Sequence, residues 1–469
     1  MLSYRKLAMR VLGRPLHTGG SDSPRPASQR AAAFILTAAM LITLAAPAFA
    51  KEWYIEDGNI TVKAGDTKGT NKVSQGTNKD VVDTDTIITG TSDTNTVTID
   101  TSKGNVDVTF DDLNIDASSR NEAAVSVTGS GNTTIMLDGD NHLTGGISDN
   151  GSYGLSGISS SGSLTISGGE TDSLTAQGGS GTDGSGGRGI FSKDLTIYGG
   201  TVNANGGNCG DGNYSDGGSG IRISSRSLTI YDGKVNAKGG NGGDGNYSDG
   251  GSGISSNGSL AISGGTVDAK GGNCGNGNYS DGGNGISSSG SIDLSGSLEL
   301  TAKAGSPNGK ALSQNGSELV LDTIKDKLGP GAKVTATDAD GKVIDQVSTP
   351  RPVEPEESSS SSDGGSAAPS APASPLPGLT VTDKSGAVIS YTSTQSGNTL
   401  TVCVGRFTAS FRISLAALRQ LRAEGIETIT FQTILCSTTL SVDELLAMGG
   451  EDADAVLTHR FTDSSLTVG

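Results

Sequence analysis

A short motif recurs along most of this chain and restricts the folds that it can adopt. In each copy an apolar-polar-apolar triplet, such as Leu195-Thr196-Ile197, is followed by a turn and a second alternating stretch, such as Val202-Asn203-Ala204. The spacings run from 27 to 33 residues, and the copies begin at Val108, Ile135, Leu164, Leu195, Leu228, Leu260, Ile292 and Leu319. A unit of this length buries its apolar face only against neighbouring copies.

A third short strand precedes the triplet in several copies, and three strands per copy favour a right-handed parallel β-helix. These strands lie at Ile158, Ile190, Ile221, Ile254 and Ile286. Alternation places Leu, Ile, Val and Ala inside each coil, and successive coils stack ~4.8 Å apart. Proline is absent from Lys51 to Ser306, as expected for strands in hydrogen-bonded ladders. A β-propeller also repeats short strands, but its blades need four strands and ~40 or more residues.

Glycine, which makes up 73 of the 469 residues, is concentrated in the same repeats. Its positions do not follow a three-residue period through the chain, which excludes collagen. Leu, Ile and Val recur between the glycines, which argues against disorder. The 1 Trp, 9 Tyr and 8 Phe are too few for an α/β enzyme with a large aromatic core. We therefore expect an all-β chain with the parallel β-helix over residues 51–348.

The composition changes after the repeats. Residues 349–378 are rich in proline, serine and alanine and read as a semi-extended linker. Residues 379–469 read as a small α+β domain, for which we expect an attachment role or a protein partner.

The expected elements of this domain follow from caps and alternation. Ser414 begins an amphipathic helix that ends at Gly425, and Ser441 with Glu444 forms a capping box for a second helix. Strands are expected at residues 399–404 and 428–434.

Residues 1–50 have the pattern of a secretory signal peptide. A basic segment precedes an apolar run from Ala31 to Ala46, and small residues at Ala48 and Ala50 suit signal peptidase. An uncleaved membrane anchor is the alternative, although the run is shorter than the ~20 apolar residues of a membrane span. No later segment has the pattern of a membrane span. We expect a secreted protein at the bacterial cell surface.

The net charge restricts the partners. The whole chain carries −17, and residues 51–469, with 27 basic and 49 acidic residues, carry −22. Binding to nucleic acid needs Lys and Arg to displace counterions, so a nucleic-acid function is excluded. An acidic polysaccharide would also be repelled, unless a divalent cation joins the two.

Three successive repeats contain almost the same long loop, at residues 206–218, 239–251 and 271–283. Stacking of the coils would turn equivalent loop residues into rows ~4.8 Å apart. The four expected rows are Tyr214, Tyr247 and Tyr279; Asn213, Asn246 and Asn278; Asp216, Asp249 and Asp281; and Asp211, Asp244 and Asn276.

Two interpretations of these rows remain open. In the first, the aspartates bind Ca²⁺, which takes six to eight oxygen ligands, and the tyrosines and asparagines bind sugar rings. In the second, Asn, Asp and Gly are turn residues that tolerate left-handed φ, and Tyr stacks on Tyr to stiffen the loop.

The four cysteines allow two bridges. Cys209 and Cys274 occupy equivalent positions two coils apart, or ~9.6 Å, which exceeds the ~7 Å that a disulfide spans. Cys403 and Cys436 lie on neighbouring expected strands and are the better candidates.

A catalytic function has little support in the residues. Arg222 and Arg226 are the best candidates for the base of a polysaccharide lyase, but an outward-facing strand also places charges there. The acidic pair Asp111-Asp112 points to opposite faces of a strand, whereas hydrolysis needs two carboxylates at a fixed separation.

The repeat unit Gly-Ile-x-Ser-x-x-Ser-Leu, seen here with its continuation from Gly253 to Gly272, resembles the glycine-rich β-helix surface proteins of Gram-positive bacteria, the carbohydrate-binding domain family. The resemblance covers about Trp53 to Val347. It implies a right-handed β-helix, and the family includes calcium-containing proteins that bind plant cell-wall polysaccharide. No metal ligand of the family maps onto the long loops.

We therefore expect a secreted, non-catalytic β-helix that binds a polysaccharide or cell-surface glycan with the help of Ca²⁺. A protein-binding adhesin on the same scaffold is the first alternative, and a polysaccharide lyase is the second.

Overall fold

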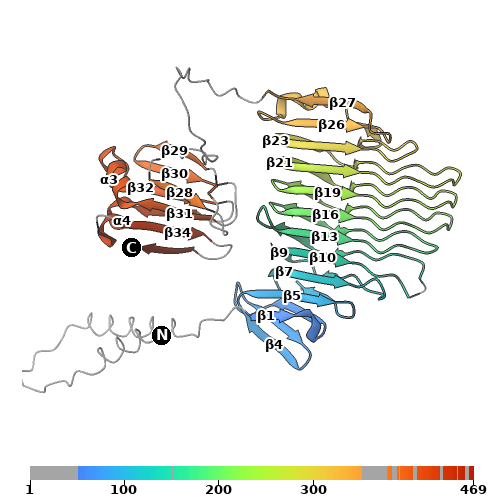
Figure 1. The fold of residues 1–469 in the computed structure, drawn as a ribbon, viewed down its shortest axis with the longest axis horizontal. Coiled ribbons are helices and arrows are strands. Elements are labelled where there is room, and N and C mark those ends of the chain that lie inside the picture. The colour runs from blue at the N-terminus through green and yellow to red at the C-terminus, as the bar shows by residue number, and fades with distance from the viewer. Residues whose placement is uncertain are drawn as a thin grey trace, which may run out of the picture. The chain divides into compact units, whose positions relative to one another are not determined.

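The structure, a computed structural model, describes residues 51–350 except 150, and residues 376–469 except 377, 383–387, 390, 405–408, 434–436, 451–452 and 460–463. The predicted signal peptide (1–50) and most of the predicted linker (349–378) therefore lie outside the described residues. The described chain forms a β-solenoid of about 11 turns and a small C-terminal region (Figure 1). The predicted parallel β-helix is confirmed.

Two long sheets form the walls of the solenoid. The first sheet has two halves that meet at a bend. Three long strands run through both halves: β7 (Val106–Asp116), β21 (Ser259–Lys270) and β23 (Ile292–Lys303). The half before the bend also contains β9 (Asn132–Asp138), β12 (Ser163–Ser167), β15 (Asp194–Ile197) and β18 (Ser227–Ile230). The half after the bend contains β10 (Asp140–Thr144), β13 (Ser173–Gln177), β16 (Thr201–Asn205) and β19 (Lys234–Lys238).

The second sheet holds the third strand of each coil. Its strands are β2 (Ile60–Ala64), β6 (Val97–Asp100), β8 (Val125–Thr128), β11 (Ile158–Ser160), β14 (Ile190–Ser192), β17 (Ile221–Ile223), β20 (Ile254–Ser256), β22 (Ile286–Ser288) and β24 (Leu312–Gln314). The short strands expected at Ile158, Ile190, Ile221, Ile254 and Ile286 are all present.

The core is built by equivalent residues in parallel register. Leu195 pairs with Leu228 and Leu228 with Leu260, and all three are fully buried. The outward residues between them are polar or small, because side chains on a strand alternate between the two faces. Each buried Leu or Ile contributes about 1.5–3 kcal/mol, so a stack of such coils supplies the core that one coil lacks.

Antiparallel strands close both ends. At the first end β3 (Asn71–Gln75) and β4 (Asn78–Asp83) form antiparallel pairs outside β2. The first strand, β1 (Lys51–Tyr54), instead pairs with β5 (Thr86–Ser92) in parallel, and the 3₁₀ helix η1 (Ile55–Asp57) lies between β1 and β2 in the chain. At the other end β25 (Ser317–Glu318) pairs with β24, and β27 (Val343–Ser348) pairs with β26 (Lys333–Thr337). Such pairs stop further parallel addition at the sheet edges.

The repeat expected to begin at Leu319 is not a coil strand. Asn315 and Gly316 both have positive φ, at 50° and 79°, and an Asn-Gly pair of this kind makes a tight hairpin turn. The chain therefore reverses into β25, and the 3₁₀ helix η2 (Leu321–Lys327) follows. The apolar alternation at Leu319 predicted a coil strand, but the Asn315-Gly316 turn reverses the chain before it.

The C-terminal region contains two four-stranded sheets and two helices. One sheet is β28 (Leu379–Thr382), β31 (Ala409–Ser414), β34 (Asp454–His459) and β35 (Ser464–Val468), and the other is β29 (Thr392–Ser396), β30 (Thr399–Cys403), β32 (Thr428–Gln432) and β33 (Ser437–Ser441). The helices are α3 (Leu415–Ala423) and α4 (Val442–Met448). Both predicted caps are present, since the Ser414 and Ser441 hydroxyls accept from the N–H groups of Ala417 and Glu444.

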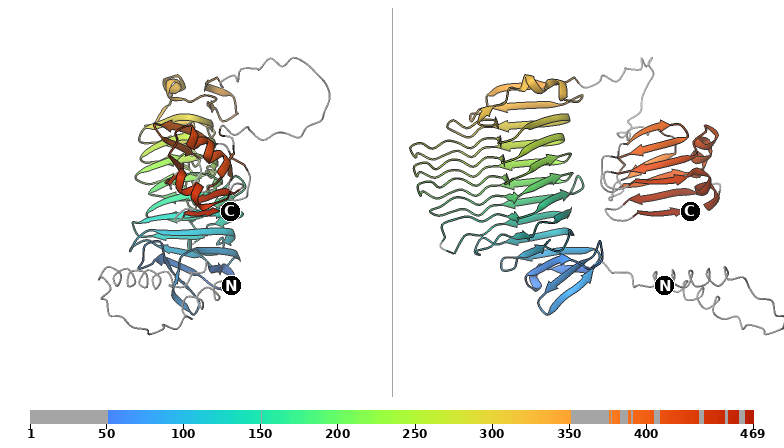
Figure 2. Two further views of the ribbon diagram at one scale, coloured as in Figure 1. Left: turned by 90° about the vertical axis from the view of Figure 1, so that its left-hand side faces the viewer. Right: turned by 180° about the vertical axis from the view of Figure 1, so that it is seen from behind.

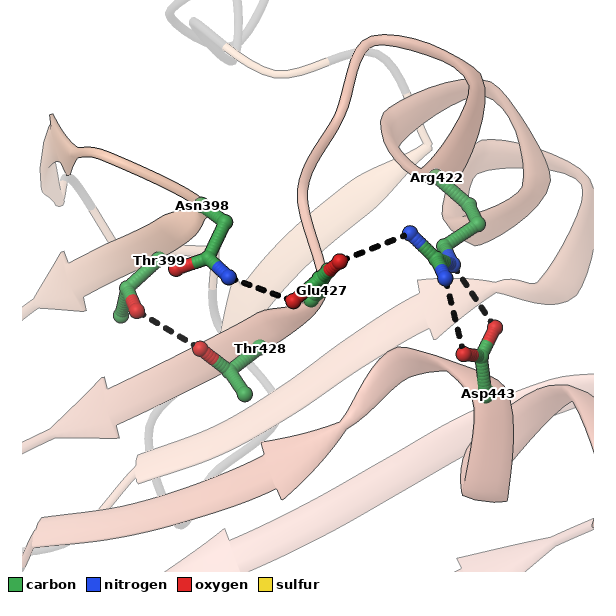
Figure 3. Close-up of polar contacts among 6 residues, drawn as sticks. All are labelled: Asn398, Thr399, Arg422, Glu427, Thr428 and Asp443. Atoms are coloured by element: carbon green, nitrogen blue, oxygen red, sulfur yellow. Dashed lines mark hydrogen bonds and ion pairs between the residues drawn. The ribbon is translucent and has the colours of Figure 1, made fainter.

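A polar network fastens α3 to its neighbours. Arg422 of α3 donates to Asp443 of α4 from Nε at 2.8 Å and from Nη2 at 3.0 Å, and its Nη1 lies 3.6 Å from Glu427 (Figure 3). Glu427 also accepts from Asn398, while the Thr399 and Thr428 hydroxyls bond across β30 and β32 at 2.7 Å. Arg422, Asp443, Glu427 and Asn398 form one connected group, and Thr399 and Thr428 form a separate pair beside it. These bonds join neighbouring elements and therefore serve the fold.

Among the described residues, none of the helices has the length and apolarity to cross a bilayer.

Candidate functional site

The three long loops leave the solenoid after β16, β19 and β21 and return to β17, β20 and β22. They lie as parallel traces on one side of the stacked strands (Figures 1 and 2). Backbone bonds hold them in register, since the Tyr214 N–H donates to the Asn246 carbonyl at 2.9 Å and the Tyr247 N–H to the Asn278 carbonyl at 3.0 Å. Equivalent loop residues therefore form rows, as expected from the repeats.

Each loop has an outgoing leg, which follows the first sheet, and a returning leg, which leads into the second. In the outgoing leg, the pattern of backbone N–H donors repeats every three residues. Gly206 and Cys209 donate to the next coil, whereas Gly207 and Gly210 donate to the returning leg of the preceding coil. Three residues per turn and no bonds within a leg are the properties of polyproline II. The legs thus form a two-layered slab of polyproline II-like segments.

Close approach explains the glycines of this slab. A Cβ on Gly207 would lie 2.0 Å from the Gly179 carbonyl oxygen, and a Cβ on Gly218 would lie 1.7 Å from that of Gly187. Neither glycine has a positive φ. The interpretation that these glycines are left-handed turn residues is therefore wrong, because lack of space between legs excludes a side chain.

A local three-residue pattern was the missed signal. Lys238 at the end of β19, and Asn241 and Asp244 in the second loop, are each followed by glycine, as Lys-Gly-Gly, Asn-Gly-Gly and Asp-Gly-Asn. The residue before the glycines points outward, and the glycines fill the slab. This three-residue glycine period holds only within each leg, so the glycines of the whole chain do not show it.

The asparagine and aspartate rows satisfy the remaining backbone donors. Asn213 Oδ1 accepts from the Asn246 N–H at 2.9 Å, and Asn246 Oδ1 accepts from the Asn278 N–H at 2.9 Å. A carboxylate does the same where Asp216 Oδ1 accepts from the Asp249 N–H at 3.0 Å. Each bond contributes about 0.5–1.5 kcal/mol. Asn and Asp are thus structurally required here, whatever they bind.

The aspartate row of Asp216, Asp249 and Asp281 concentrates negative charge. All three residues are exposed, and Asp249 Oδ1 accepts from the Asp281 N–H at 2.8 Å. Although Asp216 is exposed by surface area, nearby protein groups desolvate its carboxylate and raise its pKa. The hydrogen bond from the Asp249 N–H lowers this pKa in part, and the charge of Asp249 raises it. The charged row therefore has a cost that a bound cation would relieve.

A shorter acidic row lies on the outgoing legs. Asp211 Oδ1 accepts from the Asp244 N–H at 3.2 Å, and Asp244 Oδ1 accepts from the Asn276 N–H at 2.8 Å. Asn276 fills the third position without a charge. Across the described residues, no three His, Cys, Asp or Glu side chains converge as a metal site, so any Ca²⁺ ligands would be aligned carboxylates completed by other oxygens.

The tyrosine row lies at the loop tips in a strained conformation. Tyr214, Tyr247 and Tyr279 have φ values of 61°, 57° and 60°, a left-handed region that bulky residues rarely adopt. Their exposed fractions are 73%, 45% and 79%. Strain of this kind is frequent at functional sites.

The tyrosine rings stack on one another. Their centroids lie 5.0 Å apart between Tyr214 and Tyr247 and 5.1 Å apart between Tyr247 and Tyr279, with interplanar angles of 2° and 12°. Both faces of Tyr247 are therefore covered, so this tyrosine has no free ring face on which a sugar ring could stack. The row presents ring edges and hydroxyl groups, with one outer face at each end.

The thiols of the loops are not bridged. The sulfur of Cys209 accepts from the Gly243 N–H at 2.7 Å, and the thiol of Cys274 donates to the Gly275 carbonyl at 3.2 Å. Burial raises the pKa of both thiols. Cys403 is also a free thiol, and Cys436 lies outside the described residues.

Arg222, the first candidate for the base of a lyase, is hydrogen-bonded to neutral side chains. Arg222 Nη1 donates to Ser255 Oγ at 2.6 Å, and Nη2 donates to Asn257 Oδ1 at 3.0 Å. Burial lowers the pKa of Arg222. Arg226 is exposed in the following turn.

Comparisons of this chain with models of protein families, with curated proteins and with solved structures find no match.

Proposed function

We propose that the protein is a secreted, non-catalytic glycan-binding β-solenoid of the bacterial cell surface, and that the loop slab binds the glycan with Ca²⁺ as a helper. The observation that carries the proposal is the tyrosine row, which keeps three bulky side chains exposed and left-handed in three successive coils. A loop selected for stability alone would have Asn or Gly at that position.

The repetition favours binding over catalysis. A catalytic centre brings different groups to one point, whereas the slab presents the same group at successive coils. A linear glycan lying along the solenoid axis meets the same ring edge, hydroxyl and amide at each coil. Tyrosine offers an apolar edge and a polar hydroxyl to such a ligand, and Asn213, Asn246 and Asn278 keep their amide N–H groups as donors.

Ca²⁺ is proposed for the aspartate row. Asp216, Asp249 and Asp281 each supply carboxylate oxygen, and Asp211 and Asp244 form the second candidate row. Ca²⁺ completes its six to eight ligands with water or sugar oxygens. A cation there would also neutralise a surface that repels acidic sugars.

A glycan array tests the proposal, with the parent chain and with the Tyr214→Asn, Tyr247→Asn, Tyr279→Asn triple variant. Asn tolerates left-handed φ, so the variant removes the rings without adding strain. We expect glycan binding by the parent and about tenfold or greater loss in the variant. The matched control is Tyr231→Ala, which removes an exposed tyrosine stacked on Tyr198 at 4.8 Å, outside the long loops.

Chelator separates the two parts of the proposal. The readout is the glycan binding that the Tyr→Asn triple variant loses. If that binding also disappears with chelator, Ca²⁺ at the aspartate row is supported, and if it persists in the parent with chelator, Ca²⁺ is removed from that row. No glycan bound by the parent would favour the protein-binding adhesin instead, and unsaturated uronate released from pectate would establish a lyase.

A further inference from the structure

A cluster of positive charge lies on the outer face of the second sheet, outside the loop slab. Arg188 precedes β14, and Arg222 lies in β17 as the ladder partner of Phe191. The guanidinium of Arg188 lies over the Phe191 ring, 5.3 Å from its centroid. Lys193 and Arg226 follow in the next turns, where the Arg226 N–H donates to the Lys193 carbonyl at 3.0 Å. Two adjacent coils thus gather four basic residues.

Within the described residues, no carboxylate lies at ion-pair distance from Arg188 or Arg222. Among residues 51–350 that the structure describes, the ion pairs are Lys72–Asp66, Arg120–Glu122 and Lys327–Asp293. The outward neighbours in the same row are Ser159, Ser255 and Ser287. Arg188 is exposed by surface area and Arg222 is half-buried. Desolvation of the Arg188 guanidinium, together with the like charge of Arg222, lowers the pKa of Arg188.

The side chains are placed to receive an anionic group. Arg222 uses one donor each of Nη1 and Nη2 on Ser255 and Asn257, which fixes its guanidinium, and a guanidinium has five N–H donors. The backbone carbonyl of Arg188 accepts from the Gly157 N–H at 3.1 Å. Its guanidinium makes no hydrogen bond within the described residues, and its contact with the Phe191 ring orients it. Donors of both arginines therefore remain for a ligand.

We propose that Arg188 and Arg222 form a binding site for the carboxylate group of an acidic glycan. A planar guanidinium matches a carboxylate with two parallel hydrogen bonds. In a chain whose residues 51–469 carry −22, a local positive patch also directs an acidic ligand to this face. The inference rests on the proposed glycan-binding function and names a substrate class, but its site needs no Ca²⁺.

The test measures binding of polygalacturonate and of the same polymer after methyl esterification, by calorimetry in chelator. The variants are Arg188→Gln, Arg222→Gln and Arg222→Lys. We expect the parent to bind the free acid and not the ester, and each Gln variant to weaken binding about tenfold or more, as for loss of a charge-assisted hydrogen bond. Arg222→Lys keeps the charge but loses the fork, so we expect an intermediate affinity.

A double variant, Lys238→Gln with Lys270→Gln, is the control, because it removes two positive charges from the outer face of the first sheet. Arg188→Gln breaks no hydrogen bond of the fold, so its result does not depend on stability. Equal binding of acid and ester, preference for a sulfated over a carboxylated glycan, or full binding by both Gln variants would overturn the proposal.

The test of the arginine site can be distinguished from the test of the loop slab. The Tyr→Asn triple variant is expected to bind polygalacturonate in chelator as the parent does. Failure of the arginine variants to weaken binding would leave the tyrosine and Ca²⁺ experiments unaffected.

Discussion

The backbone N–H of Gly218 donates to the carbonyl of Gly207, on the opposite leg of the same loop, at 2.8 Å. The same bond recurs in the next two loops, from Gly251 to Gly240 and from Gly283 to Gly272. A bond of the same kind joins successive coils, since the Gly240 N–H donates to the Gly218 carbonyl at 2.8 Å. The loops are therefore joined in two directions, and the rows of side chains on their surface are held by backbone bonds.

Gly240→Ala is expected to disrupt the slab. A Cβ on Gly240 would lie 1.9 Å from the Gly207 carbonyl oxygen, so the legs must separate and lose their shared bonds. We expect faster hydrogen exchange in residues 206–218 and 239–251 and a loss of about 1–3 kcal/mol, the range for overpacked sites.

The control for that variant is Gly450→Ala, where a Cβ meets nothing within 4 Å. Unchanged exchange in the loops of Gly240→Ala would show that the legs are not packed as described.

Replacing Asp216, Asp249 and Asp281 together by Asn is expected to separate structure from metal binding. Asn keeps the Oδ1 acceptor and removes the charge. The pKa of Asp216 is raised in the folded state, mainly by desolvation, so its negative charge costs folding free energy. Without Ca²⁺ the Asn variant should therefore be at least as stable as the parent, as measured by thermal unfolding.

The triple Ala variant removes the acceptors as well, and we expect it to lose about 0.5–1.5 kcal/mol per bond. Adding Ca²⁺ should raise the melting temperature of the parent alone. A rise of the same size in the Asn variant would place the cation elsewhere.

The fold could be predicted because its signals are local and repeated. Leu195, Leu228 and Leu260 fall at nearly constant spacing, and alternation fixes which residues face inward. The error at Leu319 arose where the Asn315-Gly316 turn interrupts that pattern.

The site could be predicted only in part. Sequence position placed Tyr214 and Tyr247 in one row, but not the left-handed φ or the stacking of their rings. Arg188 was missed because it lies in the coil before Arg222, where Phe191 replaces the arginine. Whether two outward residues in different coils share a ligand depends on the directions of their side chains. The spacing of residues in the sequence does not contain that information.

Leu228→Ala is expected to destabilise the solenoid by about 2–5 kcal/mol, the cost of a buried cavity. Leu228 is fully buried between Leu195 and Leu260, so its coil has no other group to fill the space. Since neighbouring coils stabilise one another, we expect loss of the loop slab above and below before global unfolding, as seen by hydrogen exchange. Thr229→Ala, on the outer face of the same strand, should change stability by less than about 0.5 kcal/mol.

His459 of β34 is fully buried, with Nε2 at 2.9 Å from Thr438 Oγ1 and its ring edge-on to Phe411 at 5.4 Å between centroids. Its Nδ1 has no partner among the described residues. Burial lowers the pKa of His459, because a charged imidazole would lose its hydration. The neutral ring is therefore part of the folded state.

This arrangement predicts that acid weakens the C-terminal region. An unfolded His has a pKa of about 6.5, so below that pH the unfolded chain binds a proton that the folded chain refuses. The stabilisation is complete above that pH and is lost as pH falls, by at most about 1.4 kcal/mol per pH unit. Hydrogen exchange of β31 and β34 in the full chain, between pH 7 and pH 5 and corrected for intrinsic rates, measures it. His459→Gln, which does not titrate, should remove this dependence even if its stability is lower. The same pH dependence in His459→Gln would assign the effect to another group.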